Sequence, residues 1–202
     1  MMRALEGNGV GLVREIALAG RIQSGLERLY RLDRAADVDA FVMAAEDGER
    51  ETLFVREAED GVLELRLRLP ALEGGLDPVC QIIEGVSHFV YLADRAARKR
   101  EATQLELELQ AEVDKYVVLA ASLRDFDEVA SKKLRTRLYD DVRFAHDADT
   151  EEGERYRIAN DYARRFTARL EREYVSRARF GELHHELRRF FHFGQGEKLR
   201  AA

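Results

Sequence analysis

Apolar and charged residues alternate without interruption in one stretch of the sequence, Leu63-Glu64-Leu65-Arg66-Leu67-Arg68-Leu69-Pro70. Successive side chains of a β-strand point to opposite faces of the sheet, so this pattern predicts a strand with one buried leucine face and one charged face. Pro70 should end the strand, because proline has no amide hydrogen to donate to a neighbouring strand. The stretch therefore predicts a sheet in the first half of the chain.

Two shorter segments before this stretch give weaker strand signals. Residues 38–44 alternate apolar and other residues, and residues 53–55 form a short apolar run. The dipeptides Asp47-Gly48 and Asp60-Gly61 are turn signals between the three segments. We therefore predict a three-stranded antiparallel meander. The preceding segment Val13–Tyr30 is predicted to be a helix from its stripe of apolar residues.

The remainder of the chain is predicted to be mainly helical. Asp77-Pro78 is a helix start signal, because aspartate can cap free amides and proline suits the first helical position. Thr103-x-x-Glu106 matches a capping box and should open the next helix, which ends near Ser122. Further helices are expected at about residues 128–144, 154–179 and after Gly181.

Strands and helices that occupy separate parts of the chain are typical of the α+β class. We predict an N-terminal helix, the three-stranded antiparallel meander and a mainly helical remainder. Residues 1–124 would form the α+β core, and residues 125–202 would form a helical C-terminal extension packed on it.

The composition is that of a globular protein, since 46% of the 202 residues are hydrophobic and 36% are charged. Cys80 is the single cysteine, which excludes an internal disulfide and a cysteine-based zinc cluster. No apolar run approaches the ~20 residues that a membrane-spanning helix needs, and the first residues lack the apolar stretch of a signal peptide. We therefore expect a cytoplasmic protein without membrane contact.

A candidate site lies on the helix predicted after the sheet. Glu84 and His88 are four residues apart, so they lie one above the other on a helix. This carboxylate and imidazole could hold one metal ion together. They could instead form an ordinary helix-surface pair worth about 0.2–0.5 kcal/mol.

The following helix brings further carboxylates. Glu112 falls in the middle of its apolar side, where a buried carboxylate needs a partner, and Glu108 lies one turn earlier. Glu112 could meet His88 if the two helices pack, or it could pair with Lys115 or Arg95. We predict a polar cluster of Glu84, His88, Glu108 and Glu112, in which Glu84, His88 and Glu112 could hold a divalent metal.

The order of elements resembles that of the zincin metallopeptidases. Their motif, H-E-x-x-H, lies on the helix after a small sheet, and in the gluzincin branch a carboxylate on a following helix completes the site. This chain has Glu84-Gly85-Val86-Ser87-His88 at that place. The resemblance covers about residues 13–120 and implies a zincin-like fold, with His88 as one ligand and Glu112 or Glu108 as another.

Two positions of the motif depart from the zincin pattern. Glu84 stands in place of the first histidine, and Gly85 stands in place of the glutamate that activates the zinc-bound water. The resemblance therefore implies a degenerate site without ordinary peptidase activity. We predict a binding or regulatory protein. The alternative is a divalent-metal-dependent enzyme that uses Glu84, His88 and Glu112.

Two features of the second half bear on partners. The predicted helix at residues 154–179 is rich in arginine, which can bind phosphates, but acidic residues are interspersed. We therefore favour a charged solvent-facing helix and regard a nucleic-acid-binding module as the weaker alternative. The aromatic cluster Phe190-Phe191-His192-Phe193 either docks on the core or meets a partner. A protein partner or a homo-oligomer is the expected assembly.

Overall fold

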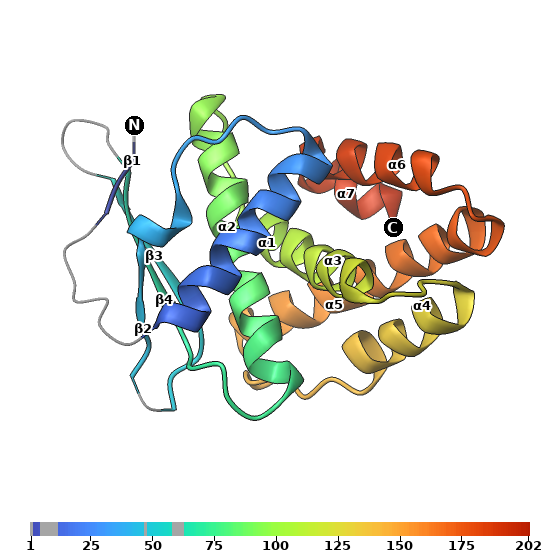
Figure 1. Ribbon diagram of the computed structural model, residues 1–202, viewed down its shortest axis with the longest axis horizontal. Coiled ribbons are helices and arrows are strands. Elements are labelled where there is room, and N and C mark those ends of the chain that lie inside the picture. The colour runs from blue at the N-terminus through green and yellow to red at the C-terminus, as the bar shows by residue number, and fades with distance from the viewer. Residues whose placement is uncertain (1, 5–11, 47, 58–62) are drawn as a thin grey trace. The chain divides into compact units, whose positions relative to one another are not determined.

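The computed structural model describes residues 2–4, 12–46, 48–57 and 63–202. The described residues confirm the α+β class, with an N-terminal helix, a small sheet and a mainly helical remainder (Figure 1). The chain forms two compact units, residues 1–101 and residues 102–202. The sequence predicts a boundary after residue 124, whereas residues 102–124 belong to the second unit in the structure.

Strand β4 (Leu63–Leu69) is the central strand of the sheet in the first unit. Strand β3 (Thr52–Glu57) pairs with it in antiparallel orientation along nearly its whole length. Strands β1 (Met2–Ala4) and β2 (Val42–Ala44) both run parallel to β4, beside its first half and its second half respectively. Because β3 occupies one edge of β4, β1 and β2 lie end to end along the other edge.

The predicted antiparallel meander is therefore right for β3 and β4 but wrong for β2, which pairs with β4 in parallel orientation. The chain does reverse between β2 and β3, where Gly48 has a φ of +84° and the Glu49 amide donates to the Glu46 carbonyl at 2.9 Å. However, β4 lies between these two strands, and its Leu67 amide donates to the Phe41 carbonyl at 2.8 Å. A central position lets the most apolar strand pair on both edges and bury its leucines.

Two predicted turn positions cannot be compared with the structure. Asp47 of the first turn signal lies outside the described residues, and so does the whole second signal, Asp60-Gly61.

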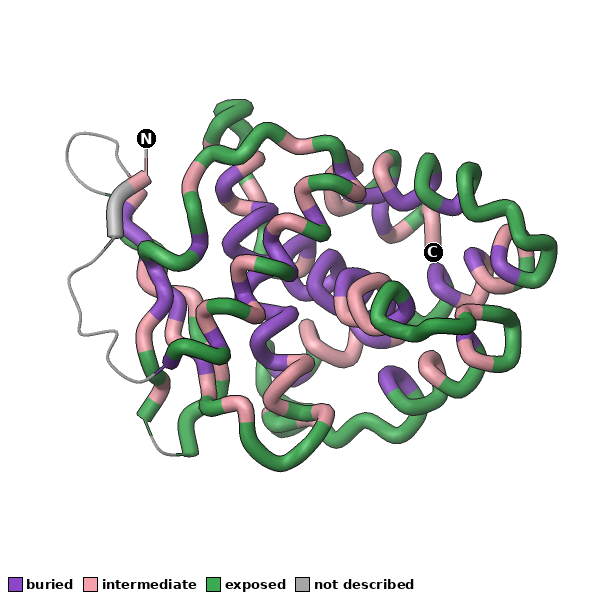
Figure 2. The backbone as a smooth tube through the Cα atoms, in the orientation of Figure 1, coloured by how far each residue is buried: buried purple, intermediate pink, exposed green. Residues whose placement is uncertain are grey.

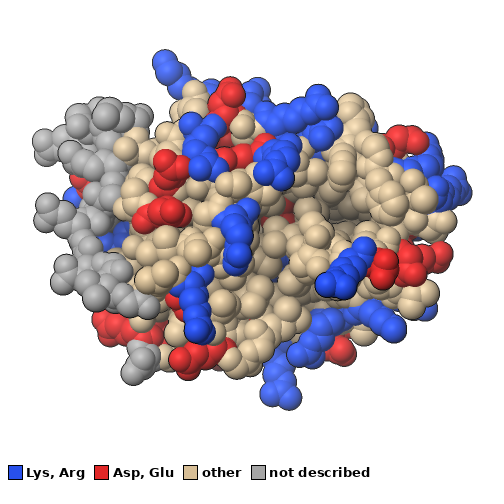
Figure 3. Space-filling model, viewed as in Figure 1, with Lys and Arg blue, Asp and Glu red and all other residues tan. Residues whose placement is uncertain are grey.

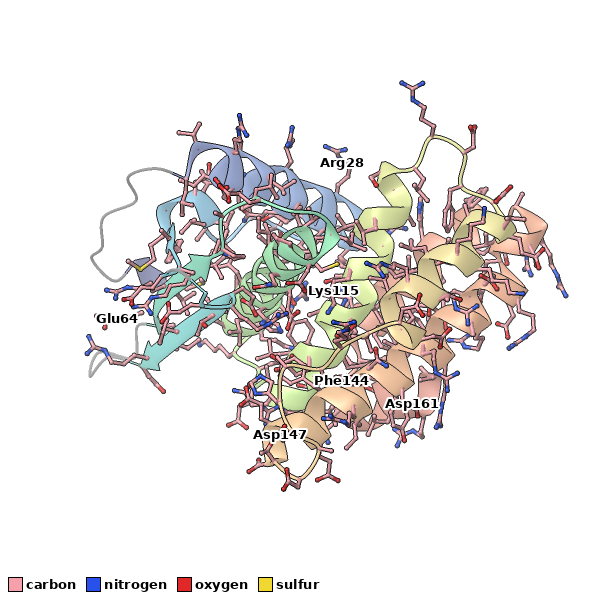
Figure 4. The ribbon with its side chains drawn as sticks, turned by 90° about the horizontal axis from the view of Figure 1, so that it is seen from below. Arg28, Glu64, Lys115, Phe144, Asp147 and Asp161 are labelled. Carbon is pink, nitrogen blue, oxygen red and sulfur yellow. The ribbon has the colours of Figure 1, made fainter. Side chains whose placement is uncertain are left out.

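The two faces of β4 differ as the alternating pattern predicted. Leu65, Leu67 and Leu69 are completely buried (Figure 2). On the opposite face, the carboxylate of Glu64 accepts a hydrogen bond from Nε of Arg56 at 2.7 Å. Figure 4 shows Glu64 on the side of the sheet that faces away from the helices of the first unit. The leucine face is therefore the one that forms the core of this unit.

Two helices cover the sheet of the first unit. Helix α1 (Val13–Tyr30) has the predicted bounds, and α2 (Leu76–Ala97) contacts both α1 and the strands β3 and β4 (Figure 1). The segment predicted as the first strand is shorter than expected, because Val38–Ala40 forms a 3-10 turn before β2. Helix α2 is therefore the element that the sheet supports directly, and it carries Glu84 and His88.

The second unit is helical, and α3 (Gln104–Ser122) packs against α5 (Glu151–Glu173) (Figure 1). Helix α5 begins earlier than predicted because the Thr150 hydroxyl accepts a hydrogen bond from the Gly153 amide at 3.0 Å. The other elements are α4 (Glu128–Arg135), a π-helical turn (Thr136–Asp140), a 3-10 turn (Val175–Arg177), α6 (Phe180–His192) and α7 (Gln195–Ala201).

The predicted capping box of α3 is present. The Glu106 amide donates to Oγ1 of Thr103 at 3.1 Å, and the Thr103 amide donates to Oε2 of Glu106 at 2.9 Å. Oγ1 of Thr103 also lies 2.7 Å from Oε1 of Gln195 on α7. The Thr103 hydroxyl therefore contacts both α3 and α7.

We expect Thr103→Ala to lower the free energy of unfolding by about 1–2 kcal/mol, because it leaves a helix amide without its cap. Urea denaturation followed by circular dichroism measures this loss. Thr103→Ser keeps the hydroxyl and should stay close to the wild type. Equal losses in both variants would contradict the capping role.

Candidate functional site

The candidate site lies on a part of α2 that is buried on every side. All residues from Gln81 to Tyr91 are buried (Figure 2). They include apolar residues and most of a polar line along one side of α2, which consists of Gln81, Glu84, His88, Tyr91 and Arg95. Within that line, Glu84 is 6% exposed and His88 is 7% exposed. A helix-surface pair would be wetted, so the simple surface interpretation of Glu84 and His88 does not describe their surroundings.

Glu51 brings a second carboxylate to His88 from outside the helix. Its Oε1 atom lies 3.9 Å from Nδ1 of His88, and the two side chains are 7% and 9% exposed. Glu51 directly precedes β3, and its backbone amide donates to Oε1 of Gln81 at 3.1 Å. The sheet and α2 together therefore hold this carboxylate beside the imidazole.

Gly85 is the residue that lets α2 approach the sheet closely. A Cβ atom at this position would lie 2.7 Å from Cδ1 of Leu67 and 2.8 Å from Oε2 of Glu51. Both contacts are too short, so a side chain here would displace both the leucine and the carboxylate. The glutamate of the zincin motif does not fit at this position while Leu67 and Glu51 stay where they are.

Other polar residues extend the line toward both ends of α2. Nε2 of Gln81 donates to Oδ2 of Asp77 at 2.6 Å near the start of the helix. Near its end, Arg95 donates to the hydroxyl of Tyr91, and its guanidinium carbon lies 4.7 Å from the centre of the Tyr91 ring. Arg95 is 6% exposed, so it is a buried cation on the same helix.

The second unit carries the other predicted site residues, Glu108 and Glu112, which are 5% and 7% exposed. Nζ of Lys115 donates to Oε1 of Glu112 at 2.7 Å, which confirms Lys115 as a partner of this carboxylate. Nε of Arg155 lies 3.9 Å from Oε1 of Glu108. Glu108 and Glu112 thus each have a cation beside them, which offsets the cost of burying their charge.

Tyr139 adds a neutral group to the surroundings of Glu112. Its hydroxyl donates to the backbone carbonyl of Glu112 at 2.9 Å. Burial raises the pKa of Tyr139 well above its usual value, and the negative charge of Glu112 raises it further. Tyr139 therefore stays protonated and acts as a hydrogen-bond donor to α3.

The four predicted site residues are divided between the two units. Glu84 and His88 lie on α2 of the first unit, whereas Glu108 and Glu112 lie on α3 of the second. The prediction that Glu112 meets His88 joins residues of both units and stays a prediction. Sequence reasoning missed Glu51, because nothing in the sequence distinguishes it from the other acidic residues near the predicted turn.

Most arginines of α5, and Glu171 of the same helix, are paired with neighbours of opposite charge in the same unit. Figure 3 shows positive and negative side chains interspersed on the visible face, and Figure 4 labels Asp161 of α5. These pairings support the interpretation of α5 as a charged solvent-facing helix. The pairs are Arg164 and Arg165 with Asp161, Arg169 and Arg172 with Glu173, and Arg135 with Glu171.

The aromatic cluster at the end of α6 is largely buried. Phe190 and Phe191 are each 1% exposed, and the Phe190 ring stacks on Phe166 of α5 with a centroid distance of 4.0 Å. Of the two predicted alternatives for this cluster, docking on the core is the one observed for these residues.

Comparison with known proteins gives no relative from which a role could be transferred: no family model, curated protein or solved structure matches this chain. Among the described residues, no helix has the length and apolar character needed to cross a membrane.

Proposed function

We propose that this protein binds a divalent metal ion through Glu84 and His88 and serves a binding or regulatory role without peptidase chemistry. The observation that carries the proposal is the burial of a carboxylate and an imidazole one turn apart on a helix that the sheet supports. Carboxylate oxygen and imidazole nitrogen together suit zinc, manganese or iron.

Gly85 is the reason to propose that the protein lacks peptidase chemistry. A zincin peptidase needs a general base at this position to take a proton from the metal-bound water. Here the position is a glycine, and Leu67 and Glu51 occupy the space where a side chain would begin. A zincin-like fold with a degenerate motif is part of the proposal, supported by a sheet followed directly by the helix with Glu84 and His88.

Metal binding is tested on protein freed of metal with a chelator. We expect calorimetric titration with Zn²⁺ or Mn²⁺ to show saturable binding, with about one ion per chain. Metal at about 100 times Kd should raise the free energy of unfolding by about 2.7 kcal/mol, because the ion binds the folded state only. His88→Ala and Glu84→Gln should remove both effects. Glu112→Gln tests whether Glu112 is the third ligand that the sequence predicts.

The second unit offers a matched control in another histidine–glutamate pair. Nδ1 of His146 lies 3.3 Å from Oε2 of Glu152, and these side chains are 36% and 48% exposed. His146→Ala should leave the affinity unchanged, because an exposed pair is hydrated and holds an ion weakly. Equal affinity in the wild type and His88→Ala would overturn the proposed site.

A further inference from the structure

We propose that Glu51 is a positioning residue for His88, whose Nδ1–H it accepts, so that Nε2 is the nitrogen that binds the metal. This inference rests on the proposed metal site at Glu84 and His88. It assigns a role to a residue outside α2 and specifies which atom of His88 is the ligand.

The geometry of the two side chains carries the assignment. Oε1 of Glu51 lies 3.9 Å from Nδ1 of His88, so Nδ1 is the ring nitrogen that faces the carboxylate. This separation exceeds the length of about 2.7–3.2 Å expected for a direct hydrogen bond. Hydrogen bonds within sites are often long in the ligand-free protein and shorten when the ligand binds, and the proposal requires such a shortening between Glu51 and His88. Because Nδ1 faces Glu51, we assign metal binding to Nε2.

The surroundings hold the Glu51 carboxylate at this place. The backbone amide of Glu51 is tied to Gln81 of α2, and the next residue, Thr52, begins β3 and pairs with Arg68 of β4. Glu51 is therefore fixed on both sides of its Cα atom. Its side chain is 7% exposed, so water competes little for the carboxylate.

Gly85 creates the space that the carboxylate occupies. Oε2 of Glu51 lies 2.8 Å from where a Cβ atom of residue 85 would be. A glycine at the second position of the degenerate motif thus has a physical use, because it admits the carboxylate that faces His88. The loss of the general base at residue 85 and the approach of the Glu51 carboxylate to the imidazole are then related.

A carboxylate behind a metal-binding histidine has two effects. It fixes the tautomer and the orientation of the ring, and it makes the other nitrogen a stronger ligand. Removing such a partner typically weakens metal binding by about 10–100-fold. The same loss is expected here when the Glu51 carboxylate is removed.

The first experiment needs no metal and tests the contact itself. Nitrogen NMR of the histidine rings, at a pH where the imidazoles are neutral, reports which nitrogen of His88 carries the proton; His88→Ala identifies its signals. We expect the proton on Nδ1 in the wild type. Glu51→Leu, which keeps the size but removes the acceptor, should shift protons to Nε2. Glu51→Gln keeps an acceptor oxygen and should retain the wild-type tautomer.

The second experiment titrates the same variants with Zn²⁺. We expect Kd to rise about 10–100-fold in Glu51→Leu and less in Glu51→Gln. Unchanged tautomer and unchanged Kd in Glu51→Leu would overturn the role of Glu51 while leaving the metal site intact. A wild type that binds no Zn²⁺ would overturn the metal site and with it this role of Glu51, even if the tautomer depends on Glu51.

Gly85→Ala provides a second variant in case Glu51→Leu fails to fold. Its methyl group would displace the carboxylate without changing the chemistry of Glu51, so the tautomer should shift in the same direction. Gly25→Ala is the matched control, because a Cβ atom at Gly25 of α1 meets nothing within 4 Å. A wild-type tautomer in Gly85→Ala would count against the proposed positioning.

Discussion

Phe89→Ala is expected to lower the free energy of unfolding by about 3–5 kcal/mol. Phe89 directly follows His88 on α2 and is completely buried, and its ring centre lies 5.0 Å from that of Phe41. Truncation removes the transfer free energy of the ring and leaves a cavity that the surrounding core fills only in part. Urea denaturation followed by circular dichroism measures the loss.

Phe54→Ala in the same unit is the matched control. Phe54 on β3 is 41% exposed and lies under the guanidinium of Arg68, 5.0 Å from its ring centre. We expect a loss below about 1 kcal/mol, since an exposed cation–π contact is worth about 0.5–1 kcal/mol. Similar losses in the two variants would mean that burial in the first unit does not control its stability.

Local patterns in the sequence predict single elements of the first unit, but not how all its strands pair. The alternation in β4 and the apolar stripe of α1 are local patterns, and both elements lie where those patterns place them. Neither pattern states which strand lies at the centre of the sheet, because pairing depends on residues far apart in the chain. The antiparallel pairing of β3 and β4 was predicted correctly, whereas β1 and the parallel pairing of β2 with β4 were not predicted.

The residues of the candidate site likewise differ in whether the sequence could predict their roles. Glu84 and His88 could be found from their helical spacing alone, because residues four apart on a helix share a face. Glu51 could not be found, since its place beside His88 depends on how β3 packs against α2 and on the space at Gly85. The role of Gly85 could not be predicted either, because it depends on the packing of Leu67 against this position.

The last helix shows a further limit of sequence reasoning. Helix α7 is short, and its only buried residue in the described structure is Lys198, so no apolar stripe marks it in the sequence. Lys198 is completely buried, and its Nζ donates to Oε1 of Gln110 at 2.6 Å and to the carbonyl of Phe190 at 2.8 Å. A lysine would ordinarily be assigned to the surface.

Lys198→Ala is expected to lower the free energy of unfolding by about 3 kcal/mol, because it removes a charged donor from two buried acceptors. Gln110 is itself completely buried and donates to Oδ1 of Asp114 at 2.9 Å, so the loss leaves a buried carboxylate with a weakened network. Lys198→Met retains most of the side-chain volume and separates packing from charge. If hydrogen bonding by Nζ contributes more than packing of the side chain, Lys198→Met should restore less than half of the free energy of unfolding that Lys198→Ala loses.

The matched control for Lys198 is Lys132, an exposed lysine on α4 of the same unit. Lys132→Ala should change the free energy of unfolding by no more than about 0.5 kcal/mol. Urea denaturation of the full chain gives all three values. Hydrogen exchange of the α7 amides adds a local measurement, because α7 has few apolar contacts to hold it once Lys198 is lost. Unchanged protection of α7 in Lys198→Ala would show that Gln195 and the other polar contacts of α7 hold this helix without the buried lysine.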